Sequence, residues 1–315
     1  MAKRVVLAML ALCACQSKDR QPTPQPAPEV RTVPREMHQL QPEVVLPKAL
    51  DFAVLEQGAE PRTQLRYVPP TKPTSYFVET SLRSRRLAAG TTQWSELSPE
   101  LKVKTGVEIQ PSSGPFTGRP LPGEALTKND DAAAYLAGWN ALGERRFALD
   151  RDDRGQFRSV HFADDPTNAR SKVEREELVQ RFLASTVPVP EQPVGRGAKW
   201  RVTWALFHAP AVVKQTATYT LEDITPQGWV VGVELQRIGD AQTLLTAPTP
   251  TDANLELIAL VRKYAGRLTV RKDELLPTGS LTVTSTLHVR MHQKRAPDLE
   301  EIAEDAGTVT FTTGS

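Results

Sequence analysis

The feature that most constrains the fold of this chain is an alternation of apolar and polar residues with a period of two. Successive side chains of a β-strand point to opposite faces, so a strand with one buried face shows this alternation. Trp200 and Val202, for example, are interleaved with Arg201 and Thr203. The pattern predicts strands buried on one face in three runs, at residues 200–206, 229–235 and 281–291.

Shorter runs of the same character predict a larger sheet. They lie at residues 64–68, 76–87, 102–110, 145–150, 156–162 and 308–313. Residues 151–155 stand between two of these runs and predict a hairpin loop. One-sided strands joined by short turns are typical of antiparallel sheets.

Three segments instead show helical spacing of their apolar residues. They cover residues 130–142, residues 169–184, and a stretch that opens at Thr249 or Thr251 and ends at Gly266. Each is amphipathic and needs an apolar surface to cover. The expected fold class is therefore α+β, a mainly antiparallel, curved, one-sided sheet packed by about three amphipathic helices.

A short internal similarity leaves the form of this sheet open. Val-Glu-Ile-Gln at 107–110 and Val-Glu-Leu-Gln at 233–236 each end a stretch that contains paired strands. The sheet is then either divided into two similar lobes, 48–185 and 186–315, or bent into one half-open barrel.

Residues 1–14 have the organisation of a bacterial export signal. Lys3 and Arg4 form a positive start, and a short apolar run follows at 5–12. A membrane-spanning helix needs about 20 apolar residues, so this run is too short to be one. We expect the signal to be removed during export.

The end of the signal predicts that Cys15 carries lipid. Leu12, Cys13 and Ala14 form a lipobox, in which a small residue precedes the modified cysteine. Cys13 fits less well as the modified residue, because Leu12, which is not small, would then directly precede the cleavage site. About three acyl chains on Cys15 would make membrane attachment effectively permanent. The mature protein is thus expected to be held at the membrane through its acylated Cys15.

Residues 15–47 predict a disordered, proline-rich tether that carries the lipidated cysteine. Residues 48–315 form the expected globular region. Gln16 stands where an aspartate would, in the enterobacterial pattern, retain a lipoprotein at the inner membrane. The predicted location is the bacterial cell envelope, at the outer membrane.

Charge and cysteine content exclude several classes of function. The chain has 39 Lys and Arg and 37 Asp and Glu, so loss of Lys3 and Arg4 leaves 37 of each. This balance gives no reason to expect a nucleic-acid partner. Cleavage would leave Cys15 as the only cysteine, with its sulfur bound to lipid, so no disulfide and no thiolate site is expected.

No group of residues predicts a catalytic site, a metal site or a cofactor. His288 and His292 are the best metal-ligand pair among the five histidines, but in a strand they lie about 13 Å apart. The loop at 150–155 begins like a calcium loop, but Arg154 stands at an oxygen-ligand position. Gly195 and its neighbours precede a strand rather than a helix and form no phosphate cradle.

One segment carries a resemblance to a known group of proteins. Residues 189–200 contain the pattern P-x-x-P-V-x-x-G-x-x-W between a predicted helix and a predicted strand. In this the chain resembles uncharacterised envelope lipoproteins typical of myxobacteria and their relatives, and residues 265–291 are similar in layout to their late strand pair. The resemblance covers about half of the chain and implies no known activity.

These observations support two hypotheses, neither of them enzymatic. In the first, the protein is a structural or interaction module that binds another envelope protein, and an exposed apolar or aromatic patch is expected. In the alternative, the apolar side of the sheet receives a lipid or another hydrophobic ligand. The first requires fewer unobserved features and is the leading expectation from the sequence.

Overall fold

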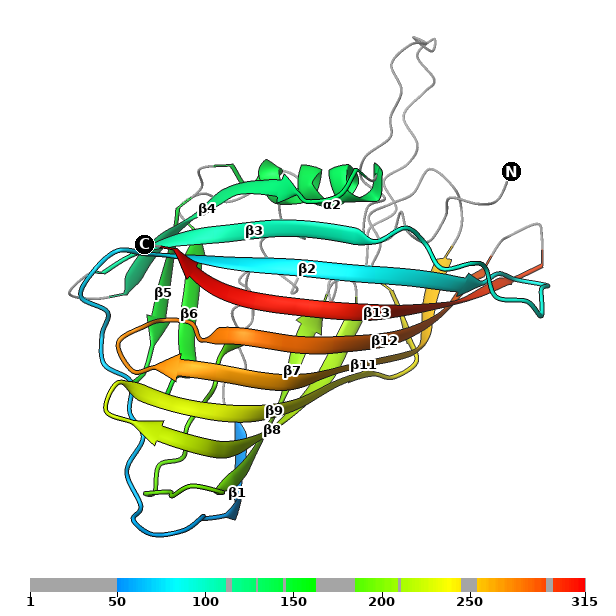
Figure 1. Cartoon of the computed structure of the whole chain (residues 1–315). Coiled ribbons are helices and arrows are strands. Elements are labelled where there is room, and N and C mark those ends of the chain that lie inside the picture. The colour runs from blue at the N-terminus through cyan, green and yellow to red at the C-terminus, as the bar shows by residue number, and fades with distance from the viewer. Residues whose placement is uncertain are drawn as a thin grey trace, which may run out of the picture.

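One antiparallel sheet of 13 strands contains every named strand of the described residues (Figure 1). The predicted signal, the tether with Cys15, and the predicted helix at 169–184 lie outside the part of the chain that is described. The computed structural model describes residues 50–111, 115–128, 130–143, 146–162, 185–208, 211–244, 254–292 and 297–314.

The strands are long, and several exceed ten residues. Those of the first half are β1 (Asp51–Glu56), β2 (Thr74–Leu87), β3 (Leu101–Gln110), β4 (Phe116–Ala125), β5 (Phe147–Arg151) and β6 (Phe157–Phe162). Those of the second half are β7 (Lys199–His208), β8 (Ala211–Thr225), β9 (Gly228–Gly239), β10 (Gln242–Thr243), β11 (Asn254–Arg271), β12 (Thr278–His292) and β13 (Leu299–Gly314).

The spatial order of the strands differs from their order in the sequence. It runs β1-β7-β8-β9-β11-β12-β13-β2-β3-β4-β5-β6, with β10 paired to β11. Strands β13 and β2, from opposite ends of the described chain, pair along their length in the middle of the sheet. The expectation of two separate lobes is therefore wrong, since both halves belong to one hydrogen-bonded sheet.

The expected α+β class is also wrong, because the described residues are nearly all β. The predicted helix at 130–142 is confirmed as α2 (Asp130–Ala141), which packs on β3 and β4. The helix expected to end at Gly266 is instead part of β11. No helix in the described part of the chain is long and apolar enough to cross a membrane.

The sheet is bent but does not close into a barrel. Figure 1 shows β5 and β6 at one end of the sheet, behind the long strands β2, β13 and β12, and β1 at the other end, at the foot of the view below β8. β1 and β6 are the two edges of the sheet. The concave face of the bent sheet, which we call the inner face, carries most of the buried apolar side chains of β7, β8, β9, β11 and β12.

Two stretches without regular structure fill the inner face beside β7 and β8. They lie near residues 63–67 and 185–198, and a single β-bridge joins Thr63 to Val194. The strand predicted at 64–68 is therefore absent. Buried aromatic side chains hold the second stretch through its carbonyl groups, because their polar ends need partners once they leave water. These bonds run from Trp200 Nε1 to Pro188 O (2.7 Å), from Tyr219 OH to Thr186 O (3.1 Å) and from Tyr67 OH to Val187 O (3.0 Å).

Arg151 joins the β5–β6 end of the sheet to the connection between β11 and β12. Its Nη1 donates to the carbonyl oxygens of Glu274 (3.1 Å) and Leu275 (2.6 Å), and its guanidinium lies 4.1 Å from the centre of the Tyr67 ring. Leu275 N in turn donates to Tyr76 OH (2.8 Å). Burial lowers the pKa of Arg151, so this charge is held away from water by a fixed set of contacts.

Candidate functional site

The predicted lipidation site cannot be compared with the structure. Cys15 and the lipobox residues Leu12, Cys13 and Ala14 lie outside the described residues. The three other features considered in the sequence, the histidine pair, the acidic loop and the segment around Gly195, lie in the described part of the chain.

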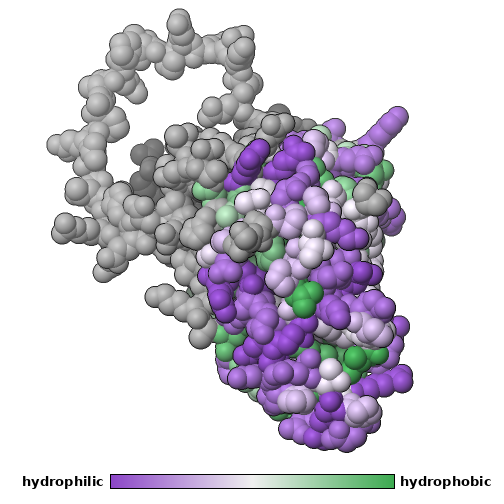
Figure 2. Space-filling view, turned by 90° about the vertical axis from the view of Figure 1, so that its left-hand side faces the viewer, coloured by the Kyte–Doolittle hydropathy of each residue, from purple (hydrophilic) through white to green (hydrophobic). Residues whose placement is uncertain are grey.

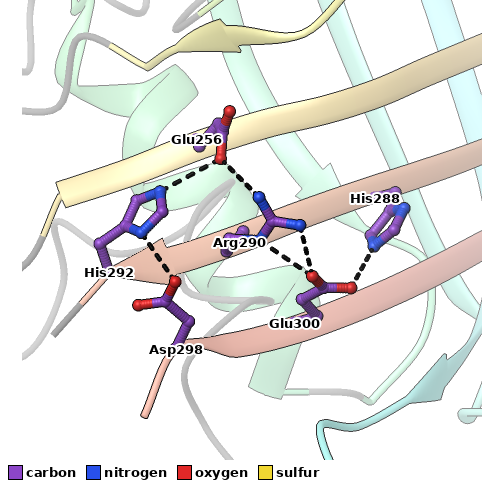
Figure 3. Close-up of polar contacts among 6 residues, drawn as sticks. All are labelled: Glu256, His288, Arg290, His292, Asp298 and Glu300. Atoms are coloured by element: carbon purple, nitrogen blue, oxygen red, sulfur yellow. Dashed lines mark hydrogen bonds and ion pairs between the residues drawn. The ribbon is translucent and has the colours of Figure 1, made fainter. Parts of the chain in front are cut away.

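His288 and His292 lie on the outer face of β12, within a cluster of charged side chains at the ends of β11, β12 and β13 (Figure 3). His292 lies between two carboxylates, with Nε2 3.1 Å from Glu256 Oε2 and Nδ1 3.0 Å from Asp298 Oδ2. His288 Nε2 is 3.2 Å from Glu300 Oε2. The two histidines thus contact different carboxylates and do not converge on one point, as the strand spacing predicted.

Arg290 links the remaining members of this cluster. Its guanidinium lies 2.7 Å from Glu300 Oε1 and 3.2 Å from Glu256 Oε2 (Figure 3). The hydrogen bond from Arg290, and next the one from His288, lower the pKa of Glu300. No group of three or more possible metal ligands occurs among the described residues. We interpret the cluster as exposed cross-strand pairing that fixes the register of three strands.

The acidic loop at 151–155 is a hairpin loop between β5 and β6, as predicted. Asp152 Oδ1 accepts hydrogen bonds from the backbone N–H groups of Arg154 (3.0 Å) and Gln156 (2.9 Å). Its carboxylate therefore stabilises the turn. Gly195 also has a structural role, because a Cβ atom there would collide with the carbonyl oxygen of Ala59.

A line of polar side chains crosses the inner face, which also carries a partly buried ion pair between Arg86 and Glu301. Its members lie directly opposite one another on six neighbouring strands, β8, β9, β11, β12, β13 and β2. We call it the inner polar row; its members are Gln215, Arg237, Arg262, Ser285, Asp305 and Ser84.

Hydrogen bonds divide the inner polar row into two groups. Ser84 Oγ donates to Asp305 Oδ1 (2.7 Å), Asp305 Oδ2 lies 4.0 Å from Arg262 Nη2, and Arg262 Nε donates to the hydroxyl of Ser285 (3.3 Å). At the other end of the row, a hydrogen bond joins Arg237 to Gln215.

Arg237 and Gln215 form the deeply buried end of the row. Arg237 is 3% exposed and Gln215 is 0% exposed. Arg237 Nε donates to Gln215 Oε1 (2.6 Å), and the guanidinium lies 5.6 Å from the centre of the Tyr264 ring. Among the described residues, Arg237 Nη2 and Gln215 Nε2 find no hydrogen-bond partner, and the same holds for the buried Nε1 atoms of Trp204 and Trp229.

The electrostatic surroundings of Arg237 are unusual for a buried cation. Burial lowers its pKa, and the nearby charge of Arg262 lowers it further. In the described part of the chain no carboxylate forms an ion pair with Arg237. A guanidinium stays protonated in proteins, so Arg237 is a buried positive charge that is incompletely compensated.

The charged members of the inner polar row outside the Arg237–Gln215 pair are less buried than that pair, although Ser285 between them is only 4% exposed. The side chains of Arg262 and Asp305 are each 18% exposed, and Ser84 is partly exposed. Apolar inner-face residues of the same region, such as Leu82 of β2 and Val309 of β13, are also only partly buried. The inner face is therefore reachable from solvent over β13 and β2 and buried over β8 and β9.

Sequence reasoning missed this row, although a signal was present. Arg237 has the same parity as the buried Val233 and Leu235, and Ser285 the same parity as Leu281 and Val283. A polar residue at an inward position of an alternating strand predicts a buried polar group.

Comparisons with models of known protein families and with curated protein sequences give no match for this chain.

Proposed function

We propose that this chain is a lipid-anchored envelope protein that binds a hydrophobic ligand against the inner face of its sheet, without catalysis. The anchor rests on the sequence of residues 12–15. The ligand role rests mainly on one observation, the unpartnered donors of Arg237 and Gln215 among apolar side chains.

Unpartnered buried donors favour a ligand because they lower stability. A buried polar group without a partner costs about 1–3 kcal/mol, and more if it is charged. Apolar replacements at Arg237 and Gln215 would avoid this cost, and binding of a ligand would account for their presence. A ligand that supplies acceptor atoms and an apolar body would satisfy the donors and contact the neighbouring apolar residues Leu235 and Val213.

The interaction module, which was the leading expectation from the sequence, is our second candidate. It calls for an apolar or aromatic surface patch. The face in Figure 2 is mainly hydrophilic, with hydrophobic residues scattered among charged ones. The large apolar residues that are exposed in the described part of the chain lie on separate elements: Leu55, Val68, Leu97, Leu126, Val212, Ile238 and Leu299. This distribution favours the inner face as the binding surface.

The test uses the full chain with Cys15→Ser, so that acyl chains on the protein do not occupy the site. An uncharged fluorescent probe for apolar sites, N-phenyl-1-naphthylamine, is titrated into this variant, and organic extracts of it are analysed by mass spectrometry. We expect saturable fluorescence enhancement and a co-purified amphiphile. Absence of both saturable probe binding and co-purified ligand would refute the proposed function.

A further inference from the structure

The inner polar row also indicates which kind of hydrophobic ligand the protein takes. We propose that the ligand is a long-chain monocarboxylate, with its carboxylate held by Arg237 and Gln215 and its chain along the inner face. This inference rests on the proposed function and specifies the ligand class.

Charge balance along the row favours one negative charge. The row contains two guanidinium groups, of Arg237 and Arg262, and one carboxylate, of Asp305. Asp305 lies beside Arg262 and is not a partner of Arg237. A monoanion at Arg237 would bring the net charge of the row to zero, whereas a phosphate dianion would leave an excess negative charge in the protein interior.

The number of unpartnered donor atoms at Arg237 and Gln215, two, equals the number of oxygen atoms in a carboxylate. Arg237 Nη2 and Gln215 Nε2 belong to side chains already fixed to each other by the bond from Arg237 Nε to Gln215 Oε1. They offer one donor for each oxygen of a planar carboxylate, and charge-assisted bonds of this kind are the strong ones. Because the donor pair is held in place before binding, little side-chain entropy remains to be lost.

Apolar residues on both sides of the buried pair provide contacts for an acyl chain. Val213 and Leu260 are buried on the inner face to one side of it, and Leu235 and Tyr264 occupy the next positions on the other. The partial exposure of Arg262 and Asp305 makes the β13–β2 side the expected entrance. A ligand entering there would meet the polar groups of the row before it reaches Arg237.

The experiment compares dodecanoate with dodecanol, which has the same chain length and no charge. Each displaces N-phenyl-1-naphthylamine from the full chain carrying Cys15→Ser. We expect dodecanoate to bind about 10-fold to 100-fold more tightly than dodecanol, the range that a charge-assisted hydrogen bond supplies. Arg237→Met should remove this preference and leave dodecanol affinity unchanged, and Arg237→Lys, which keeps the charge but loses the planar fork, should retain part of it.

The matched control is Arg267→Met, since Arg267 is 71% exposed on its side chain and pairs with Glu222 on the surface. It should change neither affinity. Circular dichroism and a urea midpoint confirm that each variant is folded. Equal affinities for dodecanoate and dodecanol, or unchanged dodecanoate binding in Arg237→Met, would overturn this inference and leave the proposed function standing. If the probe does not bind and no ligand co-purifies, the proposed function itself fails.

Discussion

Replacing Arg151 by methionine tests whether one buried side chain holds the β5–β6 end of the bent sheet to the connection between β11 and β12. Arg151 donates two hydrogen bonds, to Glu274 O and Leu275 O, and lies against the ring of Tyr67. Methionine fills much of the same volume and supplies no donor. The two carbonyl oxygens of the β11–β12 connection would then lose their charged partner.

The size of the effect follows from these contacts. Hydrogen bonds to charged groups contribute about 1.5–3 kcal/mol each. Removal of a buried charge whose pKa is lowered by burial offsets part of this loss. We expect the free energy of unfolding to fall by about 3 kcal/mol, and the melting temperature by roughly 6–12 °C, since 1 kcal/mol corresponds to roughly 2–4 °C in a domain of this size.

Urea unfolding of the full chain with Cys15→Ser, followed by tryptophan fluorescence, measures this change. Arg151→Lys should lie between the wild type and Arg151→Met, because lysine keeps the charge but not the planar fork. Arg267→Met is the surface control and should change stability by less than about 1 kcal/mol. Hydrogen exchange at the Leu275 amide should accelerate in Arg151→Met. The reasoning is refuted if Arg151→Met is as stable as the surface control.

Three further predictions concern other parts of the chain. Gly155→Ala should cost about 3 kcal/mol or more in thermal unfolding, because Gly155 has φ of 82° and a Cβ there would lie 2.5 Å from the Tyr67 ring. Gly143→Ala, with φ of 58° and nothing within 4 Å of the added carbon, should cost only about 1–2 kcal/mol, and equal losses would contradict this account. Burial raises the pKa of Glu301 above its ordinary 4.5, so the folded state binds its proton more tightly than the unfolded state does. Glu301 therefore contributes stability below about pH 4.5, and this contribution is lost as the pH rises through its raised pKa. Glu301→Gln should flatten the pH dependence of the urea midpoint. An unchanged pH dependence in this variant would contradict the assignment to Glu301. Cys15→Ser should abolish incorporation of radiolabelled palmitate and release the chain from membranes, and retention in the membrane fraction would disprove the anchor.

The sequence predicted strands well wherever alternation was uninterrupted. The helix expected in the region of β11 rested on Leu255, Ile258 and Val261. Leu255 and Val261, however, lie on opposite faces of β11, on either side of a β-bulge between Leu257 and Ala259. Leu255 and Leu257 lie on the inner face before the bulge, and Leu260 lies on it afterwards. The extra residue changes the spacing of apolar positions from two to three, and spacing of three is a helical signal. Local periodicity cannot distinguish a bulged strand from a short helix.

Other strands were missed because their residues are atypical of strands. β8 has Ala211, Gln215 and Ala217 among its inward positions, which weakens the apolar alternation. β4 contains Pro120 and Pro122, residues that usually interrupt a sheet. Tertiary pairing with β3 overrides this preference, with Pro120 opposite Val107.

The inner polar row could be predicted only in part. Parity identifies Arg237 and Gln215 as inward-facing residues once their strands are known. Their position opposite one another depends on the register of β8 and β9, and their lack of further partners depends on the whole packed interior. The sequence pattern of a single strand predicts neither the position of the two residues opposite one another nor their lack of further partners.

The pairing of β2 with β13 makes the C-terminus a central part of the molecule. Ser84 and Asp305, which share a hydrogen bond across this pair, are 221 positions apart. Both strands and the residues between them must therefore be synthesised before the middle of the sheet can form, and closing so long a loop makes such pairing slow. Loss of the last strand to a premature stop codon or a protease would split the sheet into two halves and expose a new edge on each.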